Sequence, residues 1–161
     1  MDENNLQIAT FSAGCFWGVE DAFMKVRGVK STRVGYTGGN LPNATYEDLC
    51  TDRTGHAEAI QVEYDPIEIS YEELLDLFWA IHNPTTKDRQ GPDIGTQYRS
   101  TIFYHNSEQE SIARKAKQKL EDSNKFQNNI VTEIVPATEF YQAEDYHQKY
   151  YQKISGGTCN H

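Results

Sequence analysis

Residues 6–36 read LQIATFSAGCFWGVEDAFMKVRGVKSTRVGY, and their pattern predicts a strand, a helix and a second strand. Side chains alternate from Leu6 to Phe11, which is typical of a strand with two different faces. From Cys15 to Val26 the apolar residues recur every three or four positions, as they do on one side of a helix. Gly28 ends this predicted helix, and Val29 to Tyr36 form the second predicted strand.

The rest of the chain carries five further predicted elements. They are a strand at Ile60–Tyr64, a helix from Ser70 that ends before Pro84, a strand at Arg99–Tyr104, a helix from Ser107 along Leu120, and a strand at Ile130–Val135. Capping boxes predict where the two helices begin, formed by Ser70 with Glu73 and by Ser107 with Glu110.

The order of these elements predicts an α+β fold. The first six match the split βαβ plait of ferredoxin-like folds, and an additional helix and strand follow them. We expect the helices to pack on one face of a mostly antiparallel sheet. Long loops at 37–58 and 84–98 are expected to be functional, since loops of that length are uncommon in compact domains. We predict one domain over residues 1–161, with a core at 6–136 and an irregular C-terminal arm at 137–161.

Composition and charge exclude several classes of protein. The 15 Lys and Arg against 24 Asp and Glu give a formal net charge of −9, which repels nucleic-acid phosphates. No stretch approaches the roughly 18 to 20 consecutive apolar residues of a membrane span. The first residues, MDENNLQIATF, are acidic and polar, unlike a secretory signal. We therefore expect a cytoplasmic protein that binds neither nucleic acid nor membrane.

The three cysteines are an odd number for a disulfide framework. Together with the polar N-terminus, they indicate a reducing compartment and at least one thiol retained for its chemistry. Cys159 follows two glycines near the end of the chain, which predicts a mobile thiol that can reach a reactive cysteine. Cys50 lies inside the first long loop, and we expect it to be a packing residue.

Cys15 lies in GCFWG at 14–18, where the first strand gives way to the first helix. The positive end of a helix dipole favours a thiolate there, but a free cysteine is also often a small buried apolar residue, so both interpretations stay open. Phe16 fits the apolar stripe of the helix. Trp17 does not fit it, which favours a place in the wall of a binding site.

The two long loops hold further polar candidates. Glu58 ends the stretch TGHAE at the mouth of an apolar strand, where partial burial raises the pKa of a carboxyl group until it can donate a proton near pH 7. His56 beside it fits a metal site, an acid–base site or an ordinary loop. Asp93 is placed to orient another group, and Tyr46 and Tyr98 to donate hydrogen bonds, although each residue type is also common on surfaces.

Seven blocks of sequence carry a resemblance to a known family. They are GCFWG at 14–18, VGYTGG at 34–39, TYEDLC at 45–50, RTGHAE at 53–58, NPTT at 83–86, DIGTQYRS at 93–100 and EDYHQKY at 144–150. In this order and spacing they resemble the A-type peptide methionine sulfoxide reductases over about residues 8–151. The resemblance implies a plait-like domain with loop-rich extensions.

The resemblance also implies a role for each candidate. Cys15 corresponds to the nucleophile whose thiolate attacks the sulfur of methionine-S-sulfoxide, protein-bound or free, and Glu58 to the acid that protonates the sulfoxide oxygen. Two tyrosines would hydrogen-bond that oxygen, a carboxylate would organise the polar side, and an aromatic pair would hold the S-methyl group. These substrate-binding positions are Tyr46, Tyr98, Asp93, Phe16 and Trp17.

Reduction would leave a sulfenic acid on Cys15, which a second cysteine converts to a disulfide. The resemblance implies that thioredoxin then reduces this disulfide in a repair enzyme for oxidised proteins, with no bound cofactor and with dithiothreitol as a substitute in vitro. The tail departs from the family pattern, because only Cys159 stands there. We expect Cys159 to resolve Cys15 directly in a monomer, with Cys50 as the competing resolver.

Two other functions use some of the same residues. A thiol peroxidase or disulfide oxidoreductase would also place a cysteine at a helix N-terminus, but the chain lacks C-x-x-C and such an enzyme has no need of Glu58. A metal-binding module would use Cys50, His56, Cys159 and His161. Their spacing lacks the close pairs of usual zinc ligands, apart from the last two, so we expect no metal.

Overall fold

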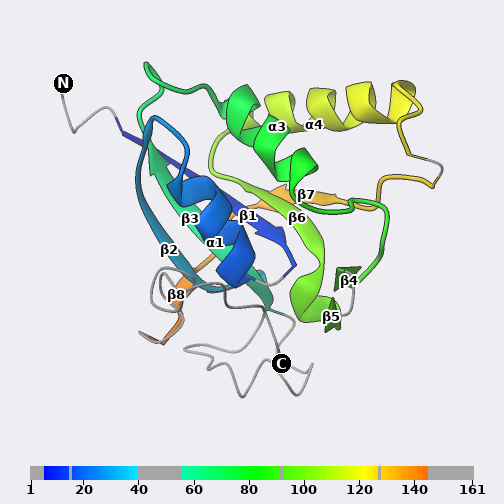
Figure 1. Cartoon of the computed structure of the whole chain (residues 1–161), viewed down its shortest axis with the longest axis horizontal. Coiled ribbons are helices and arrows are strands. Elements are labelled where there is room, and N and C mark those ends of the chain that lie inside the picture. Colours follow the sequence, from blue (N-terminus) through cyan, green and yellow to red (C-terminus); the bar gives the residue numbers. More distant parts are fainter. Residues whose placement is uncertain (1–5, 15, 40–55, 91–92, 127, 145–161) are drawn as a thin grey trace.

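A six-stranded sheet runs through the centre of the protein (Figure 1). The computed structural model describes residues 6–14, 16–39, 56–90, 93–126 and 128–144. The strands lie in the order β7-β6-β1-β3-β2-β8, and among these described strands only β6 and β7 pair in parallel. Their bounds are β1 Gln7–Ala13, β2 Val29–Thr37, β3 Ala57–Tyr64, β6 Ser100–Tyr104, β7 Glu133–Pro136 and β8 Tyr141–Gln142.

The four central strands form the predicted plait. β1 pairs antiparallel with both β3 and β6, and β2 pairs antiparallel with β3. Helix α1 (Phe16–Met24) connects β1 to β2, and α3 (Tyr71–Ala80) lies between β3 and β6 in the chain. Helix α4 (Ser107–Asp122) returns the chain so that β7 can pair in parallel with β6. The predicted α+β plait with an additional helix and strand is confirmed.

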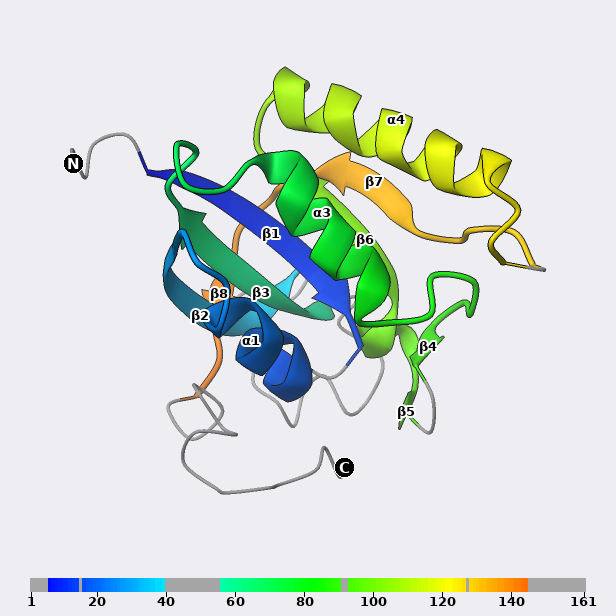
Figure 2. The ribbon, with the colours of Figure 1, turned by 45° about the horizontal axis from the view of Figure 1, so that its top comes forward.

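Helices α1, α3 and α4 cover one face of the sheet (Figures 1 and 2). Phe11 of β1 joins the first two of them, because its ring stacks 5.5 Å from that of Phe23 in α1 and 5.2 Å from that of Phe78 in α3. All three rings are fully buried. Burying one such side chain contributes roughly 1.5 to 3 kcal/mol, so these aromatic contacts are a main attachment of the helices to the sheet.

Side-chain caps fix where two of the helices begin. Ser70 caps α3, and its hydroxyl accepts from the Glu73 amide while the Glu73 side chain accepts from the Ser70 amide, as predicted. The predicted capping box at the start of α4 is wrong. Asn106 is the capping residue, and its side chain accepts from the amide of Gln109. The extended backbone of Asn106 places its short side-chain oxygen over the first turn, so Ser107 is already helical.

The structure adds elements to segments that were predicted as irregular. The second long loop contains strands β4 (Arg89–Gln90) and β5 (Asp93–Ile94) and a 3-10 turn, η2 (Thr96–Tyr98). The predicted irregular arm contributes β8, which pairs with the end of β2. Such two- or three-residue elements are too short to leave a periodic pattern. The last predicted strand also shifts, since β7 begins at Glu133 rather than Ile130.

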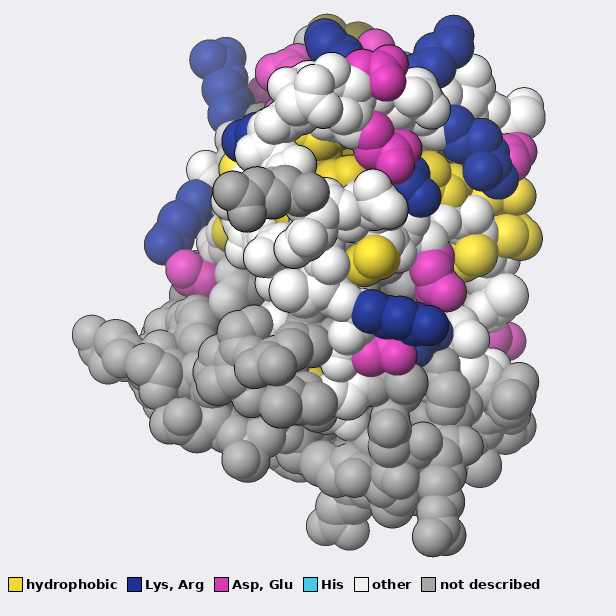
Figure 3. Space-filling model, turned by 90° about the vertical axis from the view of Figure 1, so that its right-hand side faces the viewer, with side chains coloured by type: hydrophobic (Ala, Val, Ile, Leu, Met, Phe, Trp, Pro, Cys, Tyr) yellow, Lys and Arg dark blue, Asp and Glu magenta, His cyan; other side chains and the backbone are white. Residues whose placement is uncertain are grey.

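The surface of the described part mixes charges of both signs. On the face shown in Figure 3, basic and acidic side chains lie among one another rather than in patches of one sign. Within the residues that the structure describes, no helix is long and apolar enough to span a membrane.

Candidate active site

Four strands meet at the end of the sheet where β1 and β2 finish and β3 and β6 begin, which we call the site edge. Gly14 turns the chain there from β1 into α1 with a φ of 95°, a conformation that favours glycine. A Cβ on Gly14 would also lie 2.8 Å from Cγ of Gln90. The N-terminus of α1, with its positive dipole end, therefore lies at the site edge.

Cys15 falls between Gly14 and Phe16 and lies outside the described residues, as do Tyr46, Cys50 and Cys159. For two further candidates, Phe16 and Asp93, the structure describes the backbone alone: Phe16 is the first residue of α1 and Asp93 the first of β5. The predicted roles of these six side chains remain predictions.

Glu58 is buried more deeply than its sequence context predicted. It is the second residue of β3, and it is 0% exposed. Because side chains alternate along a strand, Glu58 points to the same helix-covered face as Ile60 and Val62. Its cross-strand partner is Tyr36 of β2. A carboxyl group is thus held inside the protein at the site edge.

Gln97 hydrogen-bonds Glu58. Its Nε2 donates to Glu58 Oε2 over 3.4 Å, and the Gln97 side chain is 6% exposed. Gln97 and the predicted substrate ligand Tyr98 are successive residues of η2, and Tyr98 is 3% exposed. Trp17, in the first turn of α1, is 7% exposed. Sequence reasoning missed Gln97 as a site residue although it lies in the block DIGTQYRS, because nothing in that block links it to Glu58, which is 39 residues away.

His56 makes a structural contact beside Glu58. Its Nδ1 accepts from the amide of Gly39 over 2.9 Å, and its ring meets that of Tyr141 edge-on with 5.5 Å between the centroids. The residue is 2% exposed. It therefore links the end of β2 to β8. In the described parts of the chain, no group of three or more His, Cys, Asp or Glu side chains is placed to hold a metal ion.

His82, just after α3, contacts Ser100, the first residue of β6. His82 Nε2 lies 2.7 Å from Ser100 Oγ, which in turn lies 2.7 Å from Thr132 Oγ1. The other ring nitrogen of His82 contacts the carbonyl oxygen of Phe78. Burial lowers the pKa of His82 to about 4, against a smaller opposing effect of the bond to Phe78. The ring is therefore neutral at pH 7, and this network fixes β6 just after Tyr98.

Comparison with known proteins identifies the family. The family profile described as "Peptide methionine sulfoxide reductase" matches residues 7–161. The chain belongs to this family. The predicted family and enzyme class, an oxidoreductase of the peptide methionine sulfoxide reductase family, are thus confirmed.

Relatives from archaea and bacteria cover almost the whole chain. Peptide methionine sulfoxide reductase MsrA of Methanosarcina acetivorans is 61% identical over 92% of this chain and 79% of its own length. The enzyme of the same name from Geobacter metallireducens is 53% identical over 99% of both chains.

Solved structures of the family share the fold. Mxr1 from Saccharomyces cerevisiae in reduced form has a TM-score of 0.91 at 37% identity, over 98% of this chain and 91% of its own. Mxr1 in complex with Trx2 has a TM-score of 0.65 at 30% identity, over 92% and 87% of the two chains.

Proposed function

We propose that this chain reduces methionine-S-sulfoxide, protein-bound or free, through Cys15. The Cys15 thiolate attacks the sulfoxide sulfur, and Glu58 supplies a proton to the sulfoxide oxygen. The attack forms a bond between Cys15 Sγ and the substrate sulfur, and the protonated oxygen leaves that sulfur as water. A water molecule then attacks Cys15 Sγ and breaks the sulfur–sulfur bond, which releases the thioether of methionine and leaves Cys15 oxidised to a sulfenic acid. Membership of the peptide methionine sulfoxide reductase family supports this reaction.

The burial of Glu58 is the observation that carries the proposal. An unperturbed glutamic acid is ionised at pH 7 and has no proton to give. Removing a carboxyl group from water favours its neutral form, and Glu58 is 0% exposed at the end of the sheet from which α1 begins. Protonating the oxygen makes the sulfur more electrophilic, and general acid catalysis of this kind contributes roughly 10² to 10⁴-fold.

The proposed substrate pocket has an apolar and a polar side. Phe16 and Trp17 would hold the S-methyl group, while Tyr46 and Tyr98 would donate to the oxygen and Asp93 would organise that side. A sulfoxide sulfur is pyramidal, so an apolar wall opposite hydrogen-bond donors accepts one epimer, and we assign the S form. The burial of Trp17 and Tyr98 near the site edge supports their place in such a pocket.

Recycling completes the proposed cycle. The Cys159 thiol attacks the sulfenic acid on Cys15, a disulfide forms and water leaves, and the dithiol of thioredoxin then reduces that disulfide. The solved complex of Mxr1 with Trx2 supports a thioredoxin as the reductant. We propose that the enzyme uses no bound cofactor. We further propose a single catalytic domain that acts as a cytoplasmic monomer.

Separated S and R sulfoxide peptides test the function. With dithiothreitol as reductant, we expect turnover of the S peptide alone, and loss of more than about 10³-fold in Cys15→Ser. Cys50→Ser is the matched control and should retain activity. Equal use of the R peptide, survival of activity in Cys15→Ser, or peroxide consumption that outpaces sulfoxide reduction would each overturn the proposal.

A further inference from the structure

The side chain of Gln97 contacts Glu58, the proposed acid, on the helix-covered side of β3. Its Nε2 donates to Glu58 Oε2 over 3.4 Å, and both side chains are buried. We propose that Gln97 is a positioning residue, whose amide holds the Glu58 carboxyl group and leaves the transferable proton on Oε1. This inference rests on the proposed function, because it assumes that Glu58 acts as the acid.

The donor chemistry of an amide selects one carboxyl oxygen. A neutral carboxyl group has one carbonyl-type oxygen, which is the better acceptor, and one hydroxyl, which carries the proton. An amide N–H that points at Oε2 therefore stabilises the form with Oε2 unprotonated. Since Gln97 carries no charge, it orients the group without the strong preference for ionisation that a Lys or Arg would impose.

Backbone hydrogen bonds around Gln97 fix the turn from which its side-chain amide reaches Glu58. Within the turn η2, the amide of Tyr98 donates to the carbonyl of Gly95 over 3.0 Å, and the amide of Gly95 donates to the carbonyl of Asp88 over 2.9 Å. Gly95 has a φ of 143°, in the region that favours glycine. One short turn thus carries both Gln97 and Tyr98, so the Glu58 carboxyl and a proposed donor to the sulfoxide oxygen are positioned together.

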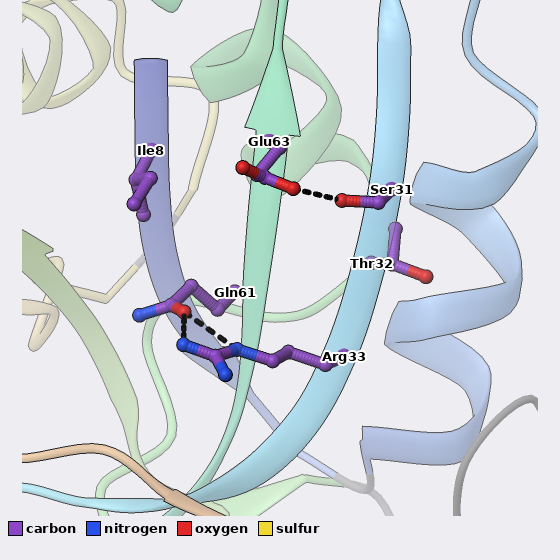
Figure 4. A pocket seen from close by; sticks show the side chains of 6 residues that line it. All are labelled: Ile8, Ser31, Thr32, Arg33, Gln61 and Glu63. Atoms are coloured by element: carbon purple, nitrogen blue, oxygen red, sulfur yellow. Dashed lines mark hydrogen bonds between the residues drawn. The ribbon is translucent and has the colours of Figure 1, made fainter. Parts of the chain in front are cut away.

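Gln61 provides a matched control on the same strand. It points to the face of the sheet that the helices leave uncovered, where its Oε1 accepts from the Arg33 guanidinium in a shallow pocket of about 250 Å³ (Figure 4). Its side chain is 9% exposed, so it is nearly as buried as Gln97. A Gln→Met change removes an amide hydrogen bond at either position, but only the change at position 97 affects Glu58.

The test is the pH profile of methionine formation in a single turnover without reductant. The variant Glu58→Gln identifies which limb of the pH profile reflects the titration of Glu58, because the residual rate of this variant should lack that limb. In Gln97→Met we expect this limb to move up by about half to one pH unit, since an amide bonds a carboxylate more strongly than a carboxylic acid. The maximal rate should fall about tenfold, and the limb set by Cys15 should stay in place.

The controls separate positioning from structure. Gln61→Met should leave both limbs unchanged, and Gln97→Asn, which withdraws the amide by one methylene, should shift the Glu58 limb in the same direction as Gln97→Met. A rate that falls equally at every pH in both Gln97 variants would overturn the role of Gln97. If Glu58→Gln keeps the wild-type rate and pH profile, Glu58 is not the acid and the proposed mechanism is wrong. This result differs from the one that would overturn only the role of Gln97.

Discussion

At the scale of single residues, His82 illustrates how burial sets a protonation state. Its Nδ1 faces the carbonyl oxygen of Phe78, which can only accept, so Nδ1 carries the proton. Nε2 of the neutral ring then accepts from the Ser100 hydroxyl, and Ser100 accepts from Thr132. A second proton on the ring would place a charge away from water, which is why the pKa of His82 is low.

We predict that His82 makes the protein less stable in acid. Its pKa is about 4 in the folded protein and 6.5 ordinarily, so between these values the unfolded chain binds a proton that the folded chain does not. The free energy of unfolding should therefore fall as pH is lowered from 6.5 to 4, by on the order of 3 kcal/mol.

Denaturant unfolding between pH 4 and 7 measures this effect. His82→Gln keeps an acceptor for Ser100 but removes the titration, so its stability should depend less on pH than that of the wild type. His105→Gln is the control, because His105 is an exposed histidine outside the network of His82, Ser100 and Thr132. The same steep loss of stability in wild type and His82→Gln would contradict the prediction.

At the scale of elements, strand β8 depends on the missing side chain of Gly35. Gly35 pairs with Gln142, and a Cβ on it would lie 2.7 Å from two ring carbons of Phe140 and still closer to the carbonyl oxygen of Tyr141. The ring of Phe140 also lies 5.1 Å from the Arg33 guanidinium carbon. The chain after β7 can therefore return across β2 only because position 35 is a glycine.

Gly35→Ala should displace β8 and destabilise the protein by about 1 to 3 kcal/mol, the usual cost of overpacking a close contact. The shift in denaturant midpoint measures it. Gly18→Ala is the control, because Gly18 is exposed within α1 and the same methyl group should stabilise a helix by about 0.5 to 1 kcal/mol. Shifts of the same sign in both variants would contradict this explanation of β8.

The sequence predicted those elements whose periodicity extends over several residues. The strand–helix–strand unit from Leu6 and the capped start of α3 are present because apolar spacing and a capping box are local signals. β8 left no such signal, because two residues cannot show a period and its pairing depends on Gly35, about a hundred residues earlier. The contact of Gln97 with Glu58 also could not be predicted from local sequence, because the two residues are 39 positions apart.

At the scale of the whole molecule, the site edge gathers segments that are far apart in the chain. The start of α1, the start of β3 and the turn η2 meet there, and β8 brings the last described residues to the same strands. The hydroxyl of Tyr36 donates to Glu144 Oε1 over 2.9 Å, and the amide of Ala143 donates to the carbonyl of Val34. The last described residues therefore lie beside β2, the strand next to the one that carries Glu58.

This position of Glu144 is compatible with the proposed role of Cys159 as the resolver. Cys159 follows Glu144 by 15 residues, and an extended chain of that length spans up to about 50 Å, enough to bring its thiol to Cys15 at the site edge.

We predict that Cys159→Ser forms one equivalent of methionine per enzyme and then stops when thioredoxin is the reductant, because the sulfenic acid on Cys15 finds no internal thiol. Cys50→Ser, the matched control, should continue to turn over. Mass mapping after one turnover should find a Cys15–Cys159 disulfide in the wild type, and a bridge from Cys15 to Cys50 would instead assign the resolving role to the first long loop.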